Sequence, residues 1–511
     1  MKTLDELRRD IDAADKDLID AFARRLKTAK AIGELKKIEG KPVFDEAREA
    51  AKIGSLKSLA AFEARPYVDR LYKEVMGIAK DLESKPLFGV LGKSIPHTYS
   101  PQIHSLITDE YAYTVIERDE DELDELWSQG KRGVYGGFNV TIPYKRNACA
   151  LCDELTEGAA NIKAVNTVVF KENGRTLGAN TDVYGFEYML KSSGIDPNGK
   201  AVLILGTGGA SAAVKEALTR LKSGSIRFVS RSGDINYGNV YDACADANII
   251  VNCTPVGMYP EVTDSPIDLT RFTNLEAVAD IVYNPSCTRL LYDAEKLGLK
   301  TAGGLKMLVA QAFKASAFFL GAANDEEAEA RVNESDIKRV TGILENRMKN
   351  ITVIGMPGSG KTEFAKELAL RLGREFIDLD DEYTKDYGVT PAQTIENEGE
   401  ETFRKNESLT ALKHLIKSGC VISCGGGIVT KQQNAFPLKC NSRVIYNERP
   451  LEALALGGRP ISAAKGTAAI YEERKDAYES LADMKISVGA KQTPEEYIEE
   501  AVRIYHENTC S

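Results

Sequence analysis

Two strand–turn–helix units with glycine-rich turns constrain the fold of this 511-residue chain more than any other feature. The first, AVLILGTGGASAAVKEAL, begins at Ala201, and the second, ITVIGMPGSGKTEFAKELAL, begins at Ile351. In each, an apolar run of strand length meets a glycine-rich turn and continues into an amphipathic helix. Such units build parallel sheets covered by helices, and their turns offer backbone N–H groups to phosphate. We therefore predict two α/β nucleotide-binding domains.

The chain is too long for one domain, because a single hydrophobic core rarely grows beyond roughly 250–300 residues. In residues 1–84 apolar residues recur at three- and four-residue spacing, and Pro42 and Pro66 stand where one helix could end and the next begin. We predict three helices there, the first of them long. Beyond them we predict an α/β domain over 86–322, a charged helical linker over 323–348 and a second α/β domain over 349–511.

Composition limits the partners of the protein. The net charge of −10 disfavours nucleic acid, and no apolar run approaches the roughly 20 residues of a membrane helix. The N-terminus does not resemble a signal peptide, and nine cysteines in so long a chain do not suggest a disulfide framework. Cys149 and Cys152 form a CxxC within NACALCDEL, which we interpret as one helix without a metal. We predict a cytoplasmic protein that binds neither nucleic acid nor membranes.

The second glycine-rich turn, from Gly355 to Thr362, fits the P-loop pattern GxxxxGK[ST] between a strand and a helix. A glycine-rich turn that fits this pattern by chance would not be expected between a strand and a helix. The pattern predicts an ATP site with Mg²⁺, in which Lys361 reaches the terminal phosphates and the Thr362 hydroxyl ligates the metal. The ATP-binding residues that we predict are Gly358, Ser359, Gly360, Lys361 and Thr362.

Residues 349–511 resemble shikimate kinase through FIDLDDEY, GEETFR, the GGG of ISCGGGIV, GGRP and ERKDAYESLAD. Two arginines alone would usually be surface ion pairs, but a planar carboxylate is best held by arginine forks. The lid segment LEALALGGRPIS is short and lacks an earlier arginine of the family. The resemblance implies Asp380 at the shikimate hydroxyls, Arg404 and Arg474 at its carboxylate, Gly425, Gly426 and Gly427 in close approach to its ring, Asp378 at magnesium and Arg459 as a catalytic residue over the transferring phosphate.

Residues 86–322 resemble shikimate dehydrogenase through GKSIPHTYSPQIH, GFNVTIPYK, AVNT, GANTDVYG, NCTPVGM, DIVYNPSCTRLL and GGLKMLVAQA. A lone Lys–Asp pair would usually be structural, but ketone reduction needs a proton donor near the developing alkoxide. Thr98 replaces a commoner serine, which in some relatives accompanies tolerance of quinate. The resemblance implies a catalytic pair of Lys145 and Asp182, a carboxylate site of Thr98 and Ser100, and hydroxyl contacts from Thr141, Asn166 and Gln311.

The nucleotide part of this domain is predicted to bind NADP(H). Its turn, Gly206-Thr-Gly208-Gly209-Ala210, is a variant dinucleotide turn, and the next strand ends in Ser230-Arg231-Ser232. An acidic residue there would bind a free ribose 2′-hydroxyl, whereas arginine favours the 2′-phosphate. By resemblance Met307 lies at the cleft. We place the substrate part at about 86–190, a Rossmann-type NADP part at about 191–300 and C-terminal helices up to 322.

Residues 1–84 resemble the all-helical chorismate mutases through LRRDIDAADKDLIDAFARRL, IGELKK and GKPVFDEARE. Any one of the charged residues could simply be a solvated helix face. However, Arg25 and Lys36 are 11 residues apart, about three turns, and share a face. By resemblance, two chains interlock as a homodimer. It also implies that Arg8, Arg25 and Arg48 hold the carboxylates of chorismate, Lys36 and Glu83 contact its ether oxygen, and Asp45 and Glu49 meet its hydroxyl.

Glu83 stands where some relatives have glutamine, so it must be protonated to donate a hydrogen bond, and mutase activity is expected to fall as rising pH ionises it.

The sequence thus implies a multifunctional enzyme whose substrates are 3-dehydroshikimate, shikimate and chorismate. The alternatives are a dehydrogenase and kinase with a non-catalytic helical dimerisation or sensing domain, a different small-molecule kinase fused to a related dehydrogenase, for instance a pair directed at quinate, and a non-enzymatic scaffold. The scaffold would not need Lys361, Lys145 and Asp182 intact.

Overall fold

The structure, a computed structural model, describes residues 2–39, 41, 46–96, 98–454, 466–489 and 493–509. It divides into two compact units, one of residues 1–183 with 311–333 and one of residues 184–310 with 334–511. Within the described residues, no helix combines the length and the apolar character needed to cross a membrane.

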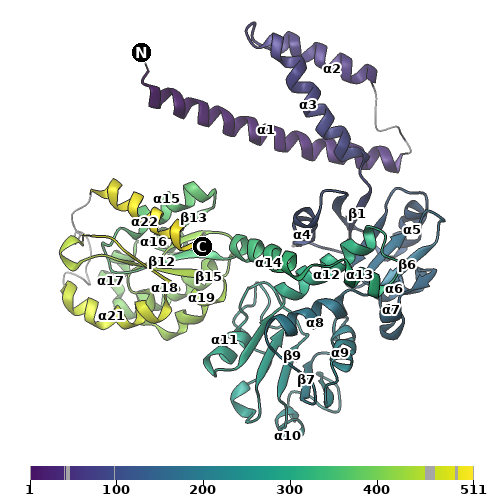
Figure 1. The fold of residues 1–511 in the computed structure, drawn as a ribbon. Helices are drawn as coiled ribbons and strands as arrows, with labels where there is room; N and C mark the ends of the chain where they lie inside the picture. Colours follow the sequence, from purple (N-terminus) through teal and green to yellow (C-terminus); the bar gives the residue numbers. More distant parts are fainter. Residues whose placement is uncertain are drawn as a thin grey trace. The chain divides into compact units, whose positions relative to one another are not determined.

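Three helices form the N-terminal region, as predicted, and the first is the longest (Figure 1). Pro66 lies in the first turn of the third helix, where its missing N–H leaves no bond unmade. The first and third helices contact each other, and Ala29 of the first and Met76 and Ala79 of the third are buried. The helices are α1 (Leu4–Ile38), α2 (Glu46–Leu59) and α3 (Arg65–Ser84).

A six-stranded sheet follows, in the order β2-β1-β3-β5-β6-β4. Its strands are β1 (Leu87–Gly92), β2 (Ala112–Glu117), β3 (Gly137–Val140), β4 (Glu154–Leu155), β5 (Thr167–Phe170) and β6 (Thr176–Ala179). Its helices are α4 (Ser100–Ile107), α5 (Leu123–Lys131), α6 (Lys145–Leu151), α7 (Glu157–Ile162), α12 (Leu305–Phe319) and α13 (Asp325–Ala330), with the short η1 (Glu120–Glu122).

The predicted single helix through NACALCDEL is wrong. Helix α6 ends at Leu151, and Cys152 already has extended backbone angles. Glu154 and Leu155 then pair with β6 as strand β4. Pairing with the sheet edge therefore overrides the helical appearance of the segment, and the two cysteines do not share one helix.

The direction of the strands gathers several loops at one edge of this sheet. Strands β1 and β3 are parallel, whereas β5 runs antiparallel to both β3 and β6. The ends of β1, β3 and β6 and the start of β5 consequently lie at the same edge. The residues that leave or enter the sheet there include Thr141, Asn166 and Asp182.

The NADP part predicted from the sequence is a five-stranded, wholly parallel sheet in the order β11-β10-β9-β7-β8. Its strands are β7 (Ala201–Leu205), β8 (Ser225–Val229), β9 (Ile249–Asn252), β10 (Ala277–Asp280) and β11 (Lys300–Gly303). Its helices are α8 (Asp182–Ser192), α9 (Ser211–Arg220), α10 (Val240–Ala243) and α11 (Arg289–Lys296), with η2 (Leu269–Arg271).

The C-terminal domain, which follows α14 (Glu334–Met348), is a second five-stranded parallel sheet, in the order β13-β14-β12-β15-β16. Its strands are β12 (Asn350–Ile354), β13 (Phe376–Asp378), β14 (Val421–Ser423), β15 (Ser442–Glu448) and β16 (Met484–Ser487). Its helices are α15 (Lys361–Leu372), α16 (Leu379–Tyr387), α17 (Pro391–Glu398), α18 (Glu400–Leu415), α19 (Ala435–Cys440), α21 (Thr467–Leu481) and α22 (Pro494–Thr509), with η3 (Ile428–Thr430), η4 (Gln432–Asn434) and η5 (Leu451–Ala453).

Helices cover both faces of this last sheet, so apolar residues on both faces of its central strands are buried. Ile351 and Val353 of β12 pack with Phe364 of α15 on one face. Ile354 packs with Tyr478 of α21 on the other. The predicted multidomain class is confirmed: a three-helix all-α part, an α/β part with a Rossmann-type sheet, and an α/β P-loop part.

Candidate functional sites

The first site is an ion pair at the gathered edge of the six-stranded sheet. Lys145, which begins α6, donates from Nζ to Oδ2 of Asp182 at 2.6 Å, and Asp182 begins α8. Their side chains are 16% and 11% exposed. Asn166 donates from Nδ2 to the other carboxylate oxygen at 2.8 Å. The structure therefore joins three of the residues predicted for substrate reduction, and it presents an ammonium group that can donate a proton.

Two more predicted substrate residues lie together at the start of α4. The Thr98 hydroxyl donates to the Ser100 hydroxyl at 3.2 Å and accepts the Ser100 backbone N–H at 3.2 Å. Both residues are half-buried. Thr141 follows β3, and its methyl group would lie 2.8 Å from a Cβ atom at Gly92. Only glycine at the end of β1 therefore leaves room for this threonine.

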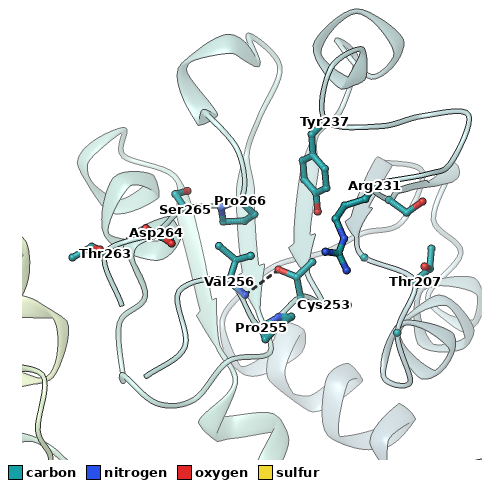
Figure 2. A pocket seen from close by; sticks show the side chains of 14 residues that line it. Thr207, Arg231, Tyr237, Cys253, Pro255, Val256, Thr263, Asp264, Ser265 and Pro266 are labelled. Carbon is teal, nitrogen blue, oxygen red and sulfur yellow. Dashed lines mark hydrogen bonds between the residues drawn. The ribbon is translucent and has the colours of Figure 1, made fainter. Parts of the chain in front are cut away.

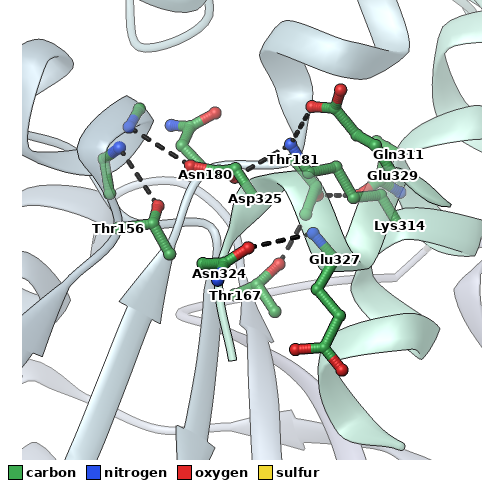
Figure 3. Close-up of polar contacts among 12 residues, drawn as sticks. Thr156, Thr167, Asn180, Thr181, Gln311, Lys314, Asn324, Asp325, Glu327 and Glu329 are labelled. Carbon is green, nitrogen blue, oxygen red and sulfur yellow. Dashed lines mark hydrogen bonds and ion pairs between the residues drawn. The ribbon is translucent and has the colours of Figure 1, made fainter. Parts of the chain in front are cut away.

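Gln311 is buried on α12, where its Oε1 accepts a hydrogen bond from the Thr181 hydroxyl at 3.2 Å (Figure 3). One turn further on, the almost fully buried Lys314 pairs with Asp325 at 2.8 Å and Glu329 at 2.7 Å. Asp325 also accepts the backbone N–H of Gly158. The first helix of the segment predicted as a linker thus fixes α12 against the substrate sheet.

The second site is a cavity of about 840 Å³ at the end of the Rossmann-type sheet (Figure 2). Four of the residues predicted to bind NADP line it, together with Tyr237, which is not among the predicted residues; the four are Gly206, Gly208, Ser230 and Arg231. Four other predicted NADP residues, Gly209, Ala210, Ser232 and Met307, are not among those that line it.

The dinucleotide turn requires its first glycine. Gly206 has φ +93°, and a Cβ atom there would lie 2.8 Å from the Thr254 methyl group. The phosphate-binding turn can therefore pass close to the loop that follows β9 only with glycine at this position. Arg231 at the end of β8 extends into the cavity beside Tyr237 (Figure 2). This arrangement suits an anionic group on the ribose of the cofactor.

The third site begins with the P-loop between β12 and α15. Gly355, Gly358 and Gly360 have φ values of +150°, +82° and +83°, and a Cβ atom at Gly355 would lie 2.5 Å from the Asn447 carbonyl oxygen. The Thr362 hydroxyl donates to Asp378 Oδ2 at 3.0 Å. The hydroxyl and carboxylate predicted for Mg²⁺ therefore lie side by side, and this donor set fits a hard cation.

Two buried arginines lie beside the glycine loop 425–427. Arg404 donates from Nη1 to Glu407 at 2.7 Å, and a Cβ atom at Gly427 would lie 2.1 Å from that same nitrogen. Arg474 donates from Nη1 to the Gly426 carbonyl oxygen at 3.0 Å. Nε of Arg404 and both Nε and Nη2 of Arg474 are buried without a hydrogen-bond partner. Because buried N–H groups without partners are costly, these guanidinium groups suit an anionic ligand such as a carboxylate.

Asp380 completes this side of the site. A Cβ atom at Gly425 would lie 3.1 Å from Asp380 Oδ1, so this carboxylate also faces the glycine loop. Burial, together with the negative charges of Asp378 and Glu407, raises the pKa of Asp380 to about 6. Asp380 can therefore accept a hydrogen bond from a hydroxyl group and exchange a proton near pH 6. Arg459, predicted to close over the phosphate, lies outside the described residues.

The residues predicted for chorismate lie on all three N-terminal helices. Arg25 of α1 donates from Nη1 to the Val75 carbonyl oxygen of α3 at 3.2 Å. Arg8 and Lys36 also belong to α1, Arg48 and Glu49 to α2, and Glu83 to α3. Lys36 and Glu49 are half-buried, whereas Arg8 and Arg48 are exposed. Asp45 and the Glu83 side chain lie outside what the structure describes.

Fold and sites together define a nicotinamide-nucleotide oxidoreductase joined to a P-loop phosphotransferase. Three segments of the chain are similar to known enzyme families. Residues 7–84 match the family model of chorismate mutase type II, residues 90–168 that of the shikimate dehydrogenase substrate binding domain, and residues 357–505 that of shikimate kinase.

The similar proteins include "Shikimate dehydrogenase (NADP(+))" of Caldicellulosiruptor bescii, which is 36% identical over 270 residues, covering 47% of this chain and 91% of that protein. The protein of the same description from Clostridium beijerinckii is 35% identical over 242 residues, covering 45% of this chain and 89% of its own length. The chain belongs to the shikimate dehydrogenase family and carries chorismate mutase and shikimate kinase segments on either side. A crystal structure of a chorismate mutase/shikimate 5-dehydrogenase fusion protein from Clostridium acetobutylicum is 30% identical, with a TM-score of 0.47 over 51% of this chain and 97% of that one.

Proposed function

We propose that this chain catalyses three reactions of aromatic amino-acid biosynthesis. It reduces 3-dehydroshikimate to shikimate with NADPH, phosphorylates shikimate to shikimate 3-phosphate with ATP, and rearranges chorismate to prephenate. The observation that supports this most strongly is that one chain carries both a Lys145–Asp182 pair and a P-loop beside two buried arginines with unused N–H groups. These are sites for consecutive steps, since the product of the first is the substrate of the second.

In the dehydrogenase site, Lys145 donates the proton that the carbonyl oxygen takes up as the ketone is reduced, and Asp182 holds the ammonium group in place. Thr98 and Ser100 bind the substrate carboxylate, and Thr141, Asn166 and Gln311 bind its hydroxyl groups. NADPH, when bound, supplies the hydride. Arg231 with its neighbouring serines holds the 2′-phosphate, and the Gly206–Ala210 turn together with Met307 completes the cofactor site.

In the kinase site, phosphoryl transfer needs positioning and charge neutralisation more than covalent chemistry. Arg404 and Arg474 fix the shikimate carboxylate, which turns the acceptor hydroxyl toward the P-loop. Asp380 accepts a hydrogen bond from the hydroxyl groups of shikimate, and Lys361 binds the terminal phosphates of ATP. Arg459 closes over the phosphoryl group during its transfer. Thr362 and Asp378 would hold Mg²⁺, whose positive charge would offset the negative charge of the phosphates.

The N-terminal helices act as a chorismate mutase that assembles as a homodimer. Large apolar residues of α1 are exposed in the single chain: Leu4, Leu7, Ile11, Leu18 and Ile19. Exposed apolar residues in such number on one helix are typical of an interface. Light scattering is expected to give a dimer, and a monomer that still turns over chorismate would argue against this assembly. We further propose a cytoplasmic protein without a nucleic-acid partner, in keeping with its net charge of −10.

Two substitutions test the assignment of two reactions to two sites. Lys145→Met is expected to lower reduction of 3-dehydroshikimate by about 10²–10⁴-fold and to leave phosphorylation of supplied shikimate intact. Lys361→Met is expected to do the reverse, so each variant is the folding control of the other. If either substitution removed both activities or neither, the assignment of the sites would be wrong.

The alternative, a non-catalytic helical domain that only dimerises or senses a ligand, is favoured by the exposure of Arg8 and Arg48 in the single chain. It predicts that the purified protein does not convert chorismate at all. The mutase proposal predicts conversion to prephenate that is lost in Arg25→Ala, while reduction and phosphorylation continue.

A further inference from the structure

Both carboxylate oxygens of Asp182 accept hydrogen bonds. The bond from Asn166 belongs to a chain of hydrogen bonds that runs into the core of the domain. Oδ2 of Asp182 accepts from Lys145 at 2.6 Å, and its Oδ1 accepts from Nδ2 of Asn166 at 2.8 Å. The backbone N–H of Thr181 donates to Oδ1 of Asn166 at 2.8 Å. A backbone N–H can only donate, so the Asn166 amide has one orientation, with its NH₂ group toward Asp182.

This orientation of the Asn166 amide determines which group donates in each hydrogen bond from Thr167 to Tyr113. The hydroxyl of Thr167, a fully buried residue, lies 3.1 Å from Oδ1 of Asn166 and must donate to it. Thr167 therefore accepts from Nδ2 of Asn139, which lies 3.1 Å away. The remaining amide oxygen of Asn139 then faces the Tyr113 hydroxyl at 2.7 Å, and Tyr113 must donate.

The Tyr113 hydroxyl, at the far end of this chain of hydrogen bonds, remains a donor. Burial raises the pKa of Tyr113 well above its usual value, so the hydroxyl keeps its proton. His104 stacks on the Tyr113 ring with centroids 3.9 Å apart, and burial lowers the pKa of His104 to about 3, which leaves a neutral ring there. The chain of bonds therefore starts at a fixed hydroxyl in the core and ends at a carboxylate in the catalytic site.

We propose that Tyr113, Asn139 and Thr167 are positioning residues of the dehydrogenase, which act through Asn166 to hold the carboxylate of Asp182, and with it the ammonium group of Lys145, in the orientation for proton donation. All six residues lie within one compact unit: on β2, β3 and β5, directly before β5, and at the first positions of α6 and α8. Polar side chains on strands that are otherwise apolar are costly unless they are fully bonded, and here each is bonded to the next. This inference rests on the proposed reduction of 3-dehydroshikimate.

The test is a substitution that removes one hydroxyl without changing shape. Thr167→Val is expected to lower kcat for 3-dehydroshikimate about tenfold, the effect of one buried hydrogen bond, with the KM for NADPH unchanged. Thr167→Ser restores the hydroxyl and is expected to return kcat to within about twofold of the wild type. Tyr113→Phe removes only the terminal donor and is expected to lower kcat in the same direction.

The matched control is Thr176→Val in the same sheet. Thr176 is also fully buried, and its hydroxyl bonds to Asp153 at 2.9 Å, away from the catalytic pair. It is expected to lower the melting temperature without changing kcat, while kinase activity of every variant reports on folding. The proposal is overturned if Thr167→Val keeps the wild-type kcat, or if Thr167→Ser is as impaired as Thr167→Val. A wild-type protein that does not reduce 3-dehydroshikimate would instead refute the proposed function itself.

Discussion

Replacement of Arg474 by lysine tests the acceptor site of the kinase most sharply. Arg474 is only 2% exposed, and its Nη1 is already engaged by the Gly426 carbonyl oxygen at 3.0 Å. Nε and Nη2 are left for a ligand, and together they match the two oxygens of a carboxylate. Lysine keeps the charge but has one nitrogen in place of this planar fork.

The size of the effect follows from the bonds lost. A hydrogen bond to a charged group contributes about 1.5–3 kcal/mol, and each 1.4 kcal/mol is tenfold in affinity. If lysine reaches the carboxylate with one bond in place of two, the KM for shikimate should rise by about 10- to 150-fold. The KM for ATP should stay within about twofold, because the P-loop is untouched.

A coupled spectrophotometric assay with varied shikimate and then varied ATP measures both constants. The matched control is Arg503→Lys on the exposed face of α22, where Arg503 pairs with Glu500 and Glu507, and neither constant should change. A KM for shikimate that rises less than about threefold in Arg474→Lys, or a KM for ATP that rises equally, would refute the assignment of Arg474 to the acceptor.

Four further predictions follow from the same sites. Because burial raises the pKa of Asp380 to about 6, the carboxylate gains its proton as pH falls through that value, so kcat/KM for shikimate should drop below about pH 6; a profile that stays flat to pH 5 would contradict this. Gly427→Ala would place a Cβ atom 2.1 Å from Arg404 and should raise the KM for shikimate at least about tenfold, with ATP kinetics as the internal control. Arg231→Ala should raise the KM for NADPH by about 10- to 150-fold and leave that for NADH nearly unchanged; equal changes would remove the 2′-phosphate role. Arg25→Ala should abolish chorismate turnover and spare both other activities, and unchanged turnover would place the mutase site elsewhere.

The glycine-rich turns made both nucleotide-binding domains predictable from the sequence. Gly206 and Gly360 adopt positive φ angles between a strand and a helix, and local sequence alone carries that information. Family resemblance supplied the pairing of Lys145 with Asp182 across 37 residues, and the structure places them 2.6 Å apart. No spacing rule could have supplied it, because the order of strands in the sheet decides which loops meet.

Contacts between residues that are distant in the sequence could not be predicted from local sequence patterns. Nothing local in YAYTVIE or GFNVTI indicates that Tyr113 of β2 and Asn139 of β3 form a hydrogen bond across the intervening strand β1, although a polar residue in a short buried strand was a signal that could have been followed. The helix predicted through NACALCDEL failed for the same reason, since pairing of Glu154 with β6 overrides local preference. Likewise, the charges of α13 look solvated in sequence, yet Asp325 reaches the buried Lys314.

A single mass-spectrometric assay shows whether one chain carries out consecutive steps on one metabolite. Purified protein receives 3-dehydroshikimate, NADPH, ATP and Mg²⁺ in one vessel, and shikimate 3-phosphate is the expected product. Omission of NADPH should leave the substrate unchanged, and omission of ATP should stop the reaction at shikimate. Unchanged 3-dehydroshikimate in the complete mixture would contradict the dehydrogenase assignment, and accumulation of shikimate without phosphate would contradict the kinase assignment.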